Sequence, residues 1–314
     1  MKPVTQENSR LGFIGIGYMG LPVARRLLEA GFQLSAYDSD PTKSAELIQY
    51  GGKVAQTISQ LSANCNVLLT CLPSDQVVLD VYRSADGVFA NATPGLRAID
   101  LSTVNPETSQ QIFRLGSAHG IDVLDVTMSG STPVAEKGLL TLFGGGNKEF
   151  FDDAEAIFRV IAQKYFYLGP SGSGATMKLV VNAILGVGMQ AIAEAVALGE
   201  KGGLDRARLL TVLSQTAVVP PALVGKLLRA MKNDYSPQFL IRLMNKDLKL
   251  ILNLAASVGA QVPATEAAFK INARQSEAGV EQDYSAVILE MERQANLEVG
   301  AREQNRSGVA SAKA

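Results

Sequence analysis

The sequence predicts an α/β domain built on parallel strands, followed by a second domain made only of helices. Between residues 11 and 168, short apolar runs alternate with helical patterns, which is typical of parallel strands joined by crossover helices. After residue 169 the helical pattern continues without a convincing strand. The chain has 314 residues, and single hydrophobic cores stop growing near ~250–300 residues. We therefore expect domains at residues 9–171 and 172–298, with a flexible tail at 299–314.

The strands of the first domain are expected where apolar runs adjoin glycine, proline, asparagine, aspartate or serine. Most are apolar along nearly their whole length, which is typical of a sheet covered on both faces. Helix 176–201 is too apolar for a water-exposed helix, so we expect it between the domains or in the interface of a homodimer or homotetramer. The expected strands are 11–17, 34–38, 65–72, 97–102, 121–128, 139–145 and 164–169; the expected helices are 21–30, 75–83, 106–118, 148–161, 176–201, 206–215, 221–231, 240–257 and 263–278.

Composition and charge argue against several classes of protein. Charged residues make up 19% of the chain and the formal net charge is -1, so neither disorder nor a basic nucleic-acid-binding surface is indicated. The N-terminus lacks the apolar segment of a secretory signal, and no run of about 18 uncharged apolar residues predicts a membrane span. Cys65 and Cys71 match neither a metal-ligand spacing nor a disulfide framework, so we expect buried strand thiols in the reducing cytoplasm.

A glycine-rich segment at residues 15–20 follows an apolar strand and opens a helix, which is the context that a dinucleotide-binding loop requires. Its glycines would allow a tight turn, a close backbone approach to the pyrophosphate and close helix packing. Asp38 ends the next strand, where a carboxylate can accept hydrogen bonds from the adenine ribose. The alternative is an ordinary glycine turn with Asp38 as a turn residue. The residues of this Rossmann-type loop are Gly15, Ile16, Gly17, Tyr18, Met19 and Gly20.

Asp38 also bears on the choice of dinucleotide. A carboxylate at this position repels a ribose 2'-phosphate, and the next residue is Ser39, not an arginine that could bind that phosphate. We therefore expect NAD as the cofactor, with NADP possible.

Six ordered segments resemble the β-hydroxyacid dehydrogenase family, which includes 3-hydroxyisobutyrate dehydrogenase and tartronate semialdehyde reductase. The resemblance extends from about residue 11 to residue 295. It implies an NAD(P)-dependent oxidoreductase that interconverts a small hydroxy acid with its semialdehyde or keto form, and hence a small substrate that carries a carboxylate. The segments are GFIGIGYMG, TCLPSDQVV, DLSTVNPET, DVTMSGSTPVAEKG, GSGATMKLVVN and NKDLKLIL.

By this resemblance, Lys178 is the catalytic lysine and Asn182 the asparagine that acts with it. Residues four apart share a helix face, so both side chains can point into one cleft. Taken without the resemblance, Lys178 is a solvated lysine near a helix start and Asn182 a polar interruption of an apolar helix. In such a helix, however, both side chains need hydrogen-bonding partners, and a substrate hydroxyl would supply one.

The substrate loop implied by the resemblance begins at Ser129 and Gly130, whose hydroxyl and backbone N–H groups would bind a carboxylate. The sequence departs from the family pattern at Ser131, where a second glycine is usual, and at Leu139, where a threonine is usual. We still expect an anion to bind here, with Ser131 among the substrate-binding residues.

Other residues are assigned to the cofactor by the same resemblance. Leu72, Pro73 and Thr103 would line the nicotinamide half of the dinucleotide, although strand-end turns often contain such residues. Lys246, in the segment KDL, would reach both cofactor and substrate. Without the resemblance, an exposed ion-pairing helix lysine is the better interpretation of Lys246.

His119 is the only histidine in the chain. It lies beside Gly120 at the expected end of a helix, so we expect it to cap that helix and not to catalyse. With no second histidine, the usual zinc site is not expected and no metal is predicted.

Two other functions stay open from the sequence. An imine reductase would share the architecture and the cofactor loop, but such enzymes typically lack the lysine found here at Lys178. A catalytically inactive dinucleotide-binding scaffold would need neither Lys178 nor Asn182.

Overall fold

The computed structural model describes residues 3–279 and 281–297. The chain forms two compact units, the first ending at Val180 and the second beginning at Val181. Helix α10 (Ser173–Lys201) runs through this point and begins just after residue 171, the last residue of the first expected domain. The predicted tail, 299–314, lies outside the described residues.

Within the described residues, one eight-stranded sheet forms the centre of the first unit, in the order β3-β2-β1-β4-β5-β6-β7-β8. All seven expected strands are present, and the expected α/β fold class is confirmed. The additional strand, β3, was not predicted because two residues are too few to show a period. The strands are β1 (Arg10–Ile14), β2 (Gln33–Tyr37), β3 (Lys53–Val54), β4 (Val67–Thr70), β5 (Arg97–Asp100), β6 (Asp122–Ser129), β7 (Leu140–Gly145) and β8 (Ala162–Tyr167).

The expectation of parallel strands throughout is wrong at one place, because β6 and β7 pair antiparallel. A parallel return needs a crossover of about a dozen residues or more, and the segment 130–139 between these strands is shorter. The other pairs are parallel. Their register brings the ends of four strands together, since Ile14 pairs with Tyr37 and Thr70, and Thr70 pairs with Asp100.

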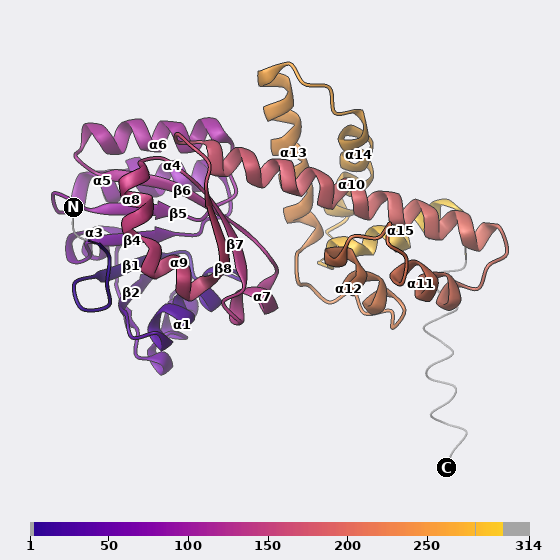
Figure 1. Cartoon of the computed structure of the whole chain (residues 1–314), viewed down its shortest axis with the longest axis horizontal. Helices are drawn as coiled ribbons and strands as arrows, with labels where there is room; N and C mark the ends of the chain where they lie inside the picture. The colour runs from indigo at the N-terminus through magenta and orange to yellow at the C-terminus, as the bar shows by residue number, and fades with distance from the viewer. Residues whose placement is uncertain (1–2, 280, 298–314) are drawn as a thin grey trace, which may run out of the picture. The chain divides into compact units, whose positions relative to one another are not determined.

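Helices cover both faces of the sheet, as the apolar strands predicted (Figure 1). One core contains Leu27 of α1 and Phe158 of α9; the other contains Tyr82 of α4 and Ile112 of α6. The single helix expected at 148–161 is two helices, because the backbone leaves helical geometry at Ala154. The helices are α1 (Gly20–Glu29), α2 (Pro41–Ala45), α3 (Ile58–Asn64), α4 (Asp75–Arg83), α5 (Val88–Asn91), α6 (Pro106–Ala118), α7 (Thr132–Glu136), α8 (Lys148–Asp153) and α9 (Glu155–Ile161).

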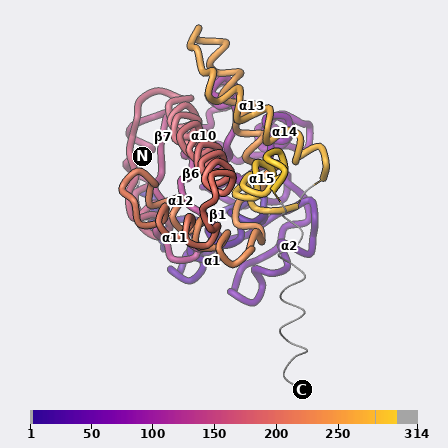
Figure 2. Tube along the Cα trace, turned by 90° about the vertical axis from the view of Figure 1, so that its right-hand side faces the viewer, coloured from indigo at the N-terminus to yellow at the C-terminus, as the bar shows by residue number. Residues whose placement is uncertain are grey.

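The second unit is helical, as expected, apart from an isolated bridge between Leu240 and Asp283 in the described residues. Its longest helix hairpin pairs α13 with α14, and Gly259 ends α13 in a left-handed conformation (φ 74°). Figures 1 and 2 both show this hairpin. A final helix, α15, was not predicted. The helices after α10 are α11 (Arg206–Ser214), α12 (Pro221–Ala230), α13 (Ile241–Val258), α14 (Pro263–Glu277) and α15 (Val287–Gln294).

Helix α10 is long and apolar enough to cross a membrane by length and composition, with a mean hydropathy of 1.7 over 18 residues. In the structure, 44% of that window is buried, and core helices of soluble proteins pass the same test, so the feature is weak evidence for a span. Three of its large apolar side chains, Val180, Ile184 and Leu198, are exposed. The expected subunit interface on this helix stays a prediction.

The cysteines differ from expectation, because neither lies within a strand. Cys65 ends α3 and Cys71 follows β4. Cys65 is buried, which raises the pKa of its thiol to about 12, whereas Cys71 is only partly buried. Neither cysteine forms a disulfide with another described residue.

Candidate active site

The glycine-rich loop joins β1 to α1 in a conformation that its glycines make possible. Gly15 has a φ of 94°, and a Cβ there would collide with the carbonyl oxygen of Cys71. A Cβ on Gly20 would collide with the carbonyl oxygen of Gly15. These contacts hold α1 close against the turn, as the motif predicted.

The N-terminus of α1 fits the phosphates of a dinucleotide. No side chain of the described residues caps this ten-residue helix, and its first turn contains no acidic residue, so its positive end is open to an anion. A Cβ on Gly17 would meet nothing within 4 Å, which leaves space over the loop. Tyr18 is 65% exposed beside it. The residues present therefore suit a bound pyrophosphate.

Asp38, directly after β2, holds the loop in place. Its carboxylate accepts hydrogen bonds from the backbone N–H of Ile16 (2.7 Å) and of Asp40 (2.9 Å). Each carboxylate oxygen has a second lone pair, so Asp38 can still accept a ribose hydroxyl. The turn role and the ribose role proposed from sequence are thus compatible.

The expected substrate loop follows β6 in the same unit. Gly130 has a φ of 143°, and a Cβ there would lie 2.7 Å from Leu140 Cδ2, so glycine is required. Ser131, the N-cap residue of α7, has extended backbone (φ -96°) that any residue adopts, and its hydroxyl makes no capping bond. The serine in place of glycine is therefore unstrained. Leu139, the other departure from the family pattern, is 46% exposed.

The substrate loop also contacts the dinucleotide loop. The Thr132 hydroxyl donates to the carbonyl oxygen of Tyr18 (3.4 Å) and lies 3.9 Å from Met19 Sδ. Ser129 ends β6 opposite Thr141 of β7. The structure thus brings Thr132, just after the expected substrate loop, next to residues 18–19 within the first unit.

Helix α10, which carries Lys178, is anchored to the sheet by a buried acid that sequence reasoning missed. Asp125 on β6 accepts hydrogen bonds from the backbone N–H of Gly172 and of Ala175, each at 2.9 Å. Burial raises the pKa of Asp125, and these N–H groups oppose the rise. Thr127 donates to the carbonyl oxygen of Gly174 (2.8 Å). The only sequence signal was an acid inside an apolar strand.

A Cβ on Gly174 would collide with the carbonyl oxygens of Phe143 and Asp125. The first turn of α10 therefore packs directly on the backbone of β6 and β7. Lys178, one turn later on the same helix, is partly buried.

The second unit brings Asn182, Lys246 and Asp247 together. Asn182 is 1% exposed, and its amide Nδ2 donates to Asp247 Oδ2 at 2.6 Å. The Lys246 ammonium lies 3.0 Å from Asp247 Oδ1. Asp247 was missed although it lies in the quoted segment KDL, because only its lysine was assigned a role. Its carboxylate orients the Asn182 amide, whose Oδ1 makes no hydrogen bond within the described residues.

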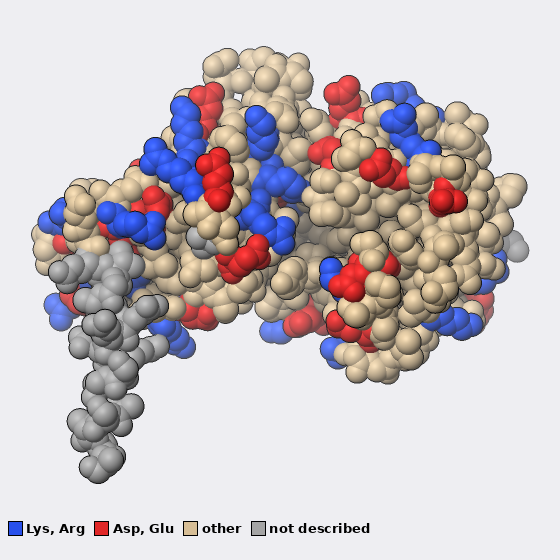
Figure 3. All heavy atoms as spheres, turned by 180° about the vertical axis from the view of Figure 1, so that it is seen from behind, with Lys and Arg blue, Asp and Glu red and all other residues tan. Residues whose placement is uncertain are grey.

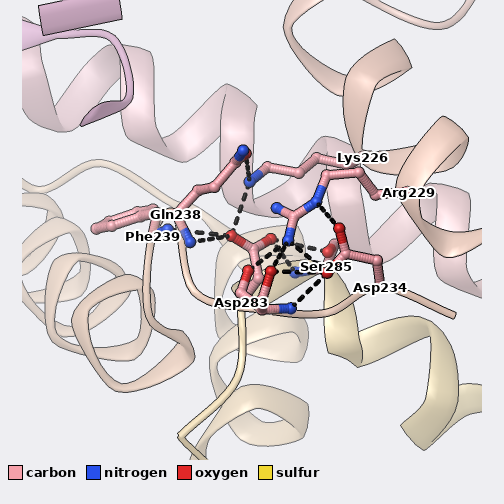
Figure 4. Close-up of polar contacts among 8 residues, drawn as sticks. Lys226, Arg229, Asp234, Gln238, Phe239, Asp283 and Ser285 are labelled. Atoms are coloured by element: carbon pink, nitrogen blue, oxygen red, sulfur yellow. Dashed lines mark hydrogen bonds and ion pairs between the residues drawn. The ribbon is translucent and has the colours of Figure 1, made fainter. Parts of the chain in front are cut away.

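A buried network positions the start of α13, which carries Lys246 and Asp247 (Figure 4). Asp283 Oδ2 accepts from the backbone N–H of Gln238 (3.1 Å) and Phe239 (3.0 Å) and pairs with the Lys226 ammonium (2.7 Å). Burial lowers the pKa of Lys226, and the charge of Asp283 opposes this. Through these hydrogen bonds and this ion pair, Asp283 fixes the backbone just before α13.

The loops expected at the nicotinamide follow β4 and β5, whose last residues pair. Leu72 is buried, Thr103 is partly buried and Pro73 is exposed. The Leu72 N–H donates to the Ser102 hydroxyl oxygen (2.8 Å), which ties the two loops to each other.

His119 is the C-cap residue of α6, and its ring Nδ1 lies 2.8 Å from the carbonyl oxygen of Leu115. The capping prediction is confirmed.

In the part of the chain that the structure describes, no group of three or more His, Cys, Asp or Glu could hold a metal.

Comparison with known proteins decides the family. The model described as the NAD binding domain of 6-phosphogluconate dehydrogenase matches residues 10–169. The model described as NAD-binding of NADP-dependent 3-hydroxyisobutyrate dehydrogenase matches residues 172–291. Glyoxylate/succinic semialdehyde reductase 1 of Arabidopsis thaliana is 32% identical over 279 residues, which are 88% of this chain and 96% of the relative. The chain belongs to the β-hydroxyacid dehydrogenase family. It is an NAD(P)-dependent oxidoreductase, as the six segments predicted.

Other members of the β-hydroxyacid dehydrogenase family agree with this. The 3-hydroxyisobutyrate dehydrogenase of Pseudomonas aeruginosa is 33% identical over 88% of this chain and 96% of its own length. The solved 3-hydroxyisobutyrate dehydrogenase of Mycobacterium tuberculosis with L-serine superposes with a TM-score of 0.81 at 30% identity, covering 89% of this chain and 98% of the other. An imine reductase from Pseudomonas sp. is 20% identical with a TM-score of 0.59, which shows a shared fold only.

Proposed function

We propose that this dehydrogenase uses NAD(H) to interconvert a short hydroxy acid and its semialdehyde or keto form. Candidate pairs are 3-hydroxyisobutyrate with its semialdehyde, glycerate with tartronate semialdehyde, 4-hydroxybutyrate with succinate semialdehyde, and the reduction of glyoxylate. The observation that carries the proposal is the buried Asn182 amide, oriented by Asp247 and placed one turn after Lys178 on α10. The names of the relatives support this substrate class.

Each group has one task in the proposed reaction. The bound dinucleotide supplies or accepts the hydride at its nicotinamide. Lys178 transfers the proton at the substrate oxygen, as ammonium during reduction and as free amine during oxidation. The Asn182 amide helps to orient that oxygen. The Ser129 hydroxyl and the N–H groups at Gly130 and Ser131 bind the substrate carboxylate without an arginine.

Asp38 is the basis for proposing NAD(H) over NADP(H). Its carboxylate, already fixed by the N–H groups of Ile16 and Asp40, would repel a 2'-phosphate. Steady-state kinetics should therefore give the higher kcat/KM with NADH. A higher kcat/KM with NADPH would show that Asp38 does not bind the adenine ribose as proposed.

A panel of substrates tests the reaction itself. NADH oxidation is measured with short semialdehydes, with glyoxylate and with cyclic imines at equal concentration. We expect the protein to oxidise NADH with at least one carboxylate-bearing aldehyde or keto acid and with none of the imines. Turnover only with imines would support the imine reductase, and NADH binding without any turnover would support the inactive scaffold.

We also propose a homodimer or homotetramer in the cytoplasm. The exposed apolar side chains of α10 motivate the oligomer. Light scattering coupled to gel filtration measures it, and a monomeric mass would contradict it.

A further inference from the structure

A chain of buried hydrogen bonds links the ends of β4 and β5 to the loop that follows β4. Asp100 Oδ1 accepts from the hydroxyls of Thr70 (2.7 Å) and Ser102 (2.6 Å) and from the Ser102 backbone N–H (3.3 Å). The Ser102 hydroxyl in turn accepts from the backbone N–H of Leu72 (2.8 Å). At the other end, the Tyr82 hydroxyl lies 3.1 Å from Thr70 Oγ1. Asp100 therefore reaches Leu72 through one serine.

The surroundings of Asp100 are unusual for a carboxylate. It is 1% exposed, and its second oxygen, Oδ2, is buried without a hydrogen bond from any described residue. In the described part of the chain, no lysine or arginine pairs with it. The ionisable groups that face it are the Tyr82 phenol on α4 and the Asp125 carboxyl on β6. Burial raises the pKa of Asp100 to about 6, with donors from Ser102 and Thr70 opposing the rise.

Residues 71 and 72, which the hydrogen-bond chain from Asp100 ends on, lie against the glycine-rich loop at Gly15. The Cys71 carbonyl and the Leu72 side chain are the groups that a Cβ on Gly15 would meet. In this sheet the order β2-β1-β4-β5 places β2 and β4 on opposite sides of β1. A dinucleotide that spans the ends of these strands with its adenine ribose at Asp38 extends its other half over β4. The segment 71–73 therefore borders the nicotinamide half.

We propose that Asp100 is a positioning residue for the nicotinamide half of the cofactor, acting through the Ser102 hydroxyl on the backbone N–H of Leu72. This inference rests on the proposed function, because it takes the loop at residues 15–20 to be occupied by NAD(H). The ionised carboxylate makes charge-assisted hydrogen bonds, which are stronger than neutral ones and fix the direction of the Ser102 hydroxyl. Protonation weakens that constraint, so the loop is held best when Asp100 is ionised.

We expect the affinity for the dinucleotide to depend on pH. If the dinucleotide binds best to the form with ionised Asp100, its affinity falls as the pH drops through the pKa of that group near 6. The carboxyl does not touch the cofactor in this scheme. Ligands that lack the nicotinamide should therefore not share the effect.

The test compares two ligands on the full-length protein between pH 5 and 8. NADH binding is followed by fluorescence titration, and ADP-ribose binding by calorimetry. The variants are Asp100→Asn, which keeps an acceptor oxygen but does not titrate, and Ser102→Ala, which removes the link to Leu72. Ser109→Ala is the matched control, because Ser109 is also buried (1% exposed) but its hydroxyl has no hydrogen-bond partner among the described residues.

For the natural protein, we expect the Kd for NADH to rise about three- to tenfold from pH 7.5 to pH 5, as for the loss of one hydrogen bond. Asp100→Asn should show the weaker, low-pH Kd at every pH. Ser102→Ala should weaken NADH binding by a similar factor. ADP-ribose binding should change less than twofold in each case, and Ser109→Ala should match the natural protein with both ligands.

An Asp100→Asn variant that keeps the pH dependence of NADH binding would overturn the proposal. Equal losses for NADH and ADP-ribose would also overturn it, since they would show general damage to the domain. Failure of the proposed function has a different signature, because the unaltered protein would then bind no NADH or would bind it without turnover.

Discussion

Lys178 is the residue on which the proposed chemistry depends most. It lies on α10, and the first turn of that helix is tied to Asp125 by the N–H groups of Gly172 and Ala175. Lys178→Ala removes the proton carrier and leaves the loop at residues 15–20 intact. We expect kcat to fall by about two to four decades, the usual contribution of general acid-base catalysis, with little change in NADH affinity.

Lys178→Arg is the informative companion variant. A guanidinium stays protonated and cannot act as the base, so it should not restore activity. A lysine without a catalytic role would instead tolerate both changes. Near-normal kcat in Lys178→Ala, with NADH binding confirmed by titration, would contradict the mechanism.

Ser129 is expected to bind substrate and not to transfer a proton. Ser129→Ala should mainly raise KM, because losing a hydrogen bond to a charged group costs about 1.5–3 kcal/mol, or roughly one to two decades in kcat/KM. The measurement is kcat/KM on the best acid or aldehyde from the substrate panel. An unchanged kcat/KM would show that Ser129 does not bind the substrate.

Ser131→Gly, which restores the usual family residue, tests whether this serine restricts the range of substrates.

At the scale of elements, the junction between β6 and α10 is the part that positions the chemistry. Asp125→Ala would leave the buried N–H groups of Gly172 and Ala175 without their acceptor. We expect a loss of about 1–3 kcal/mol in unfolding free energy and a lower kcat, since the helix that carries Lys178 loses its anchor.

Asp152→Ala is the matched control for Asp125→Ala in the same unit. Its carboxylate forms an exposed ion pair with Lys148, and such pairs contribute about 0–1 kcal/mol. Thermal unfolding followed by circular dichroism measures both variants. If the two lower the Tm equally, the anchoring role of Asp125 is wrong.

At the scale of the whole molecule, positive and negative side chains both occur across the visible face (Figure 3), in keeping with the net charge of -1. The pH dependence of stability should therefore reflect individual buried groups more than general repulsion. Asp100 is the clearest of these, because burial raises its pKa from 3.8 to about 6.

The folded protein binds the proton of the Asp100 carboxyl more tightly than the unfolded chain does. The contribution of this proton to the free energy of unfolding is therefore fully present below about pH 4 and is lost as the pH rises through about 6. Asparagine does not titrate. Asp100→Asn should therefore raise the Tm relative to the natural protein at pH 8 and leave it similar at pH 4.5. The difference corresponds to about 3 kcal/mol at most. Equal Tm differences at both pH values would show that folding does not raise the pKa of Asp100.

The sequence alone determined the features that depend on local pattern. Apolar runs located seven strands, the spacing of glycines located the dinucleotide loop, and ordered segments identified the family. These signals are local because a strand, a tight turn and a helix start each need particular residues at fixed short spacings. A two-residue strand such as β3 gives no such pattern.

Only the tertiary structure decided which polar groups meet. The bond from Asn182 to Asp247 joins residues 65 positions apart, the bond from Gly172 to Asp125 spans 47, and the bond from Leu72 to Ser102 spans 30. The antiparallel direction of β7 likewise depends on how a short connection can close. Periodicity in the sequence shows which face of an element is buried. It does not show which residues distant in sequence come into contact, because packing of the elements determines this. The role of a buried acid therefore depends on the hydrogen-bond donors that packing places next to it.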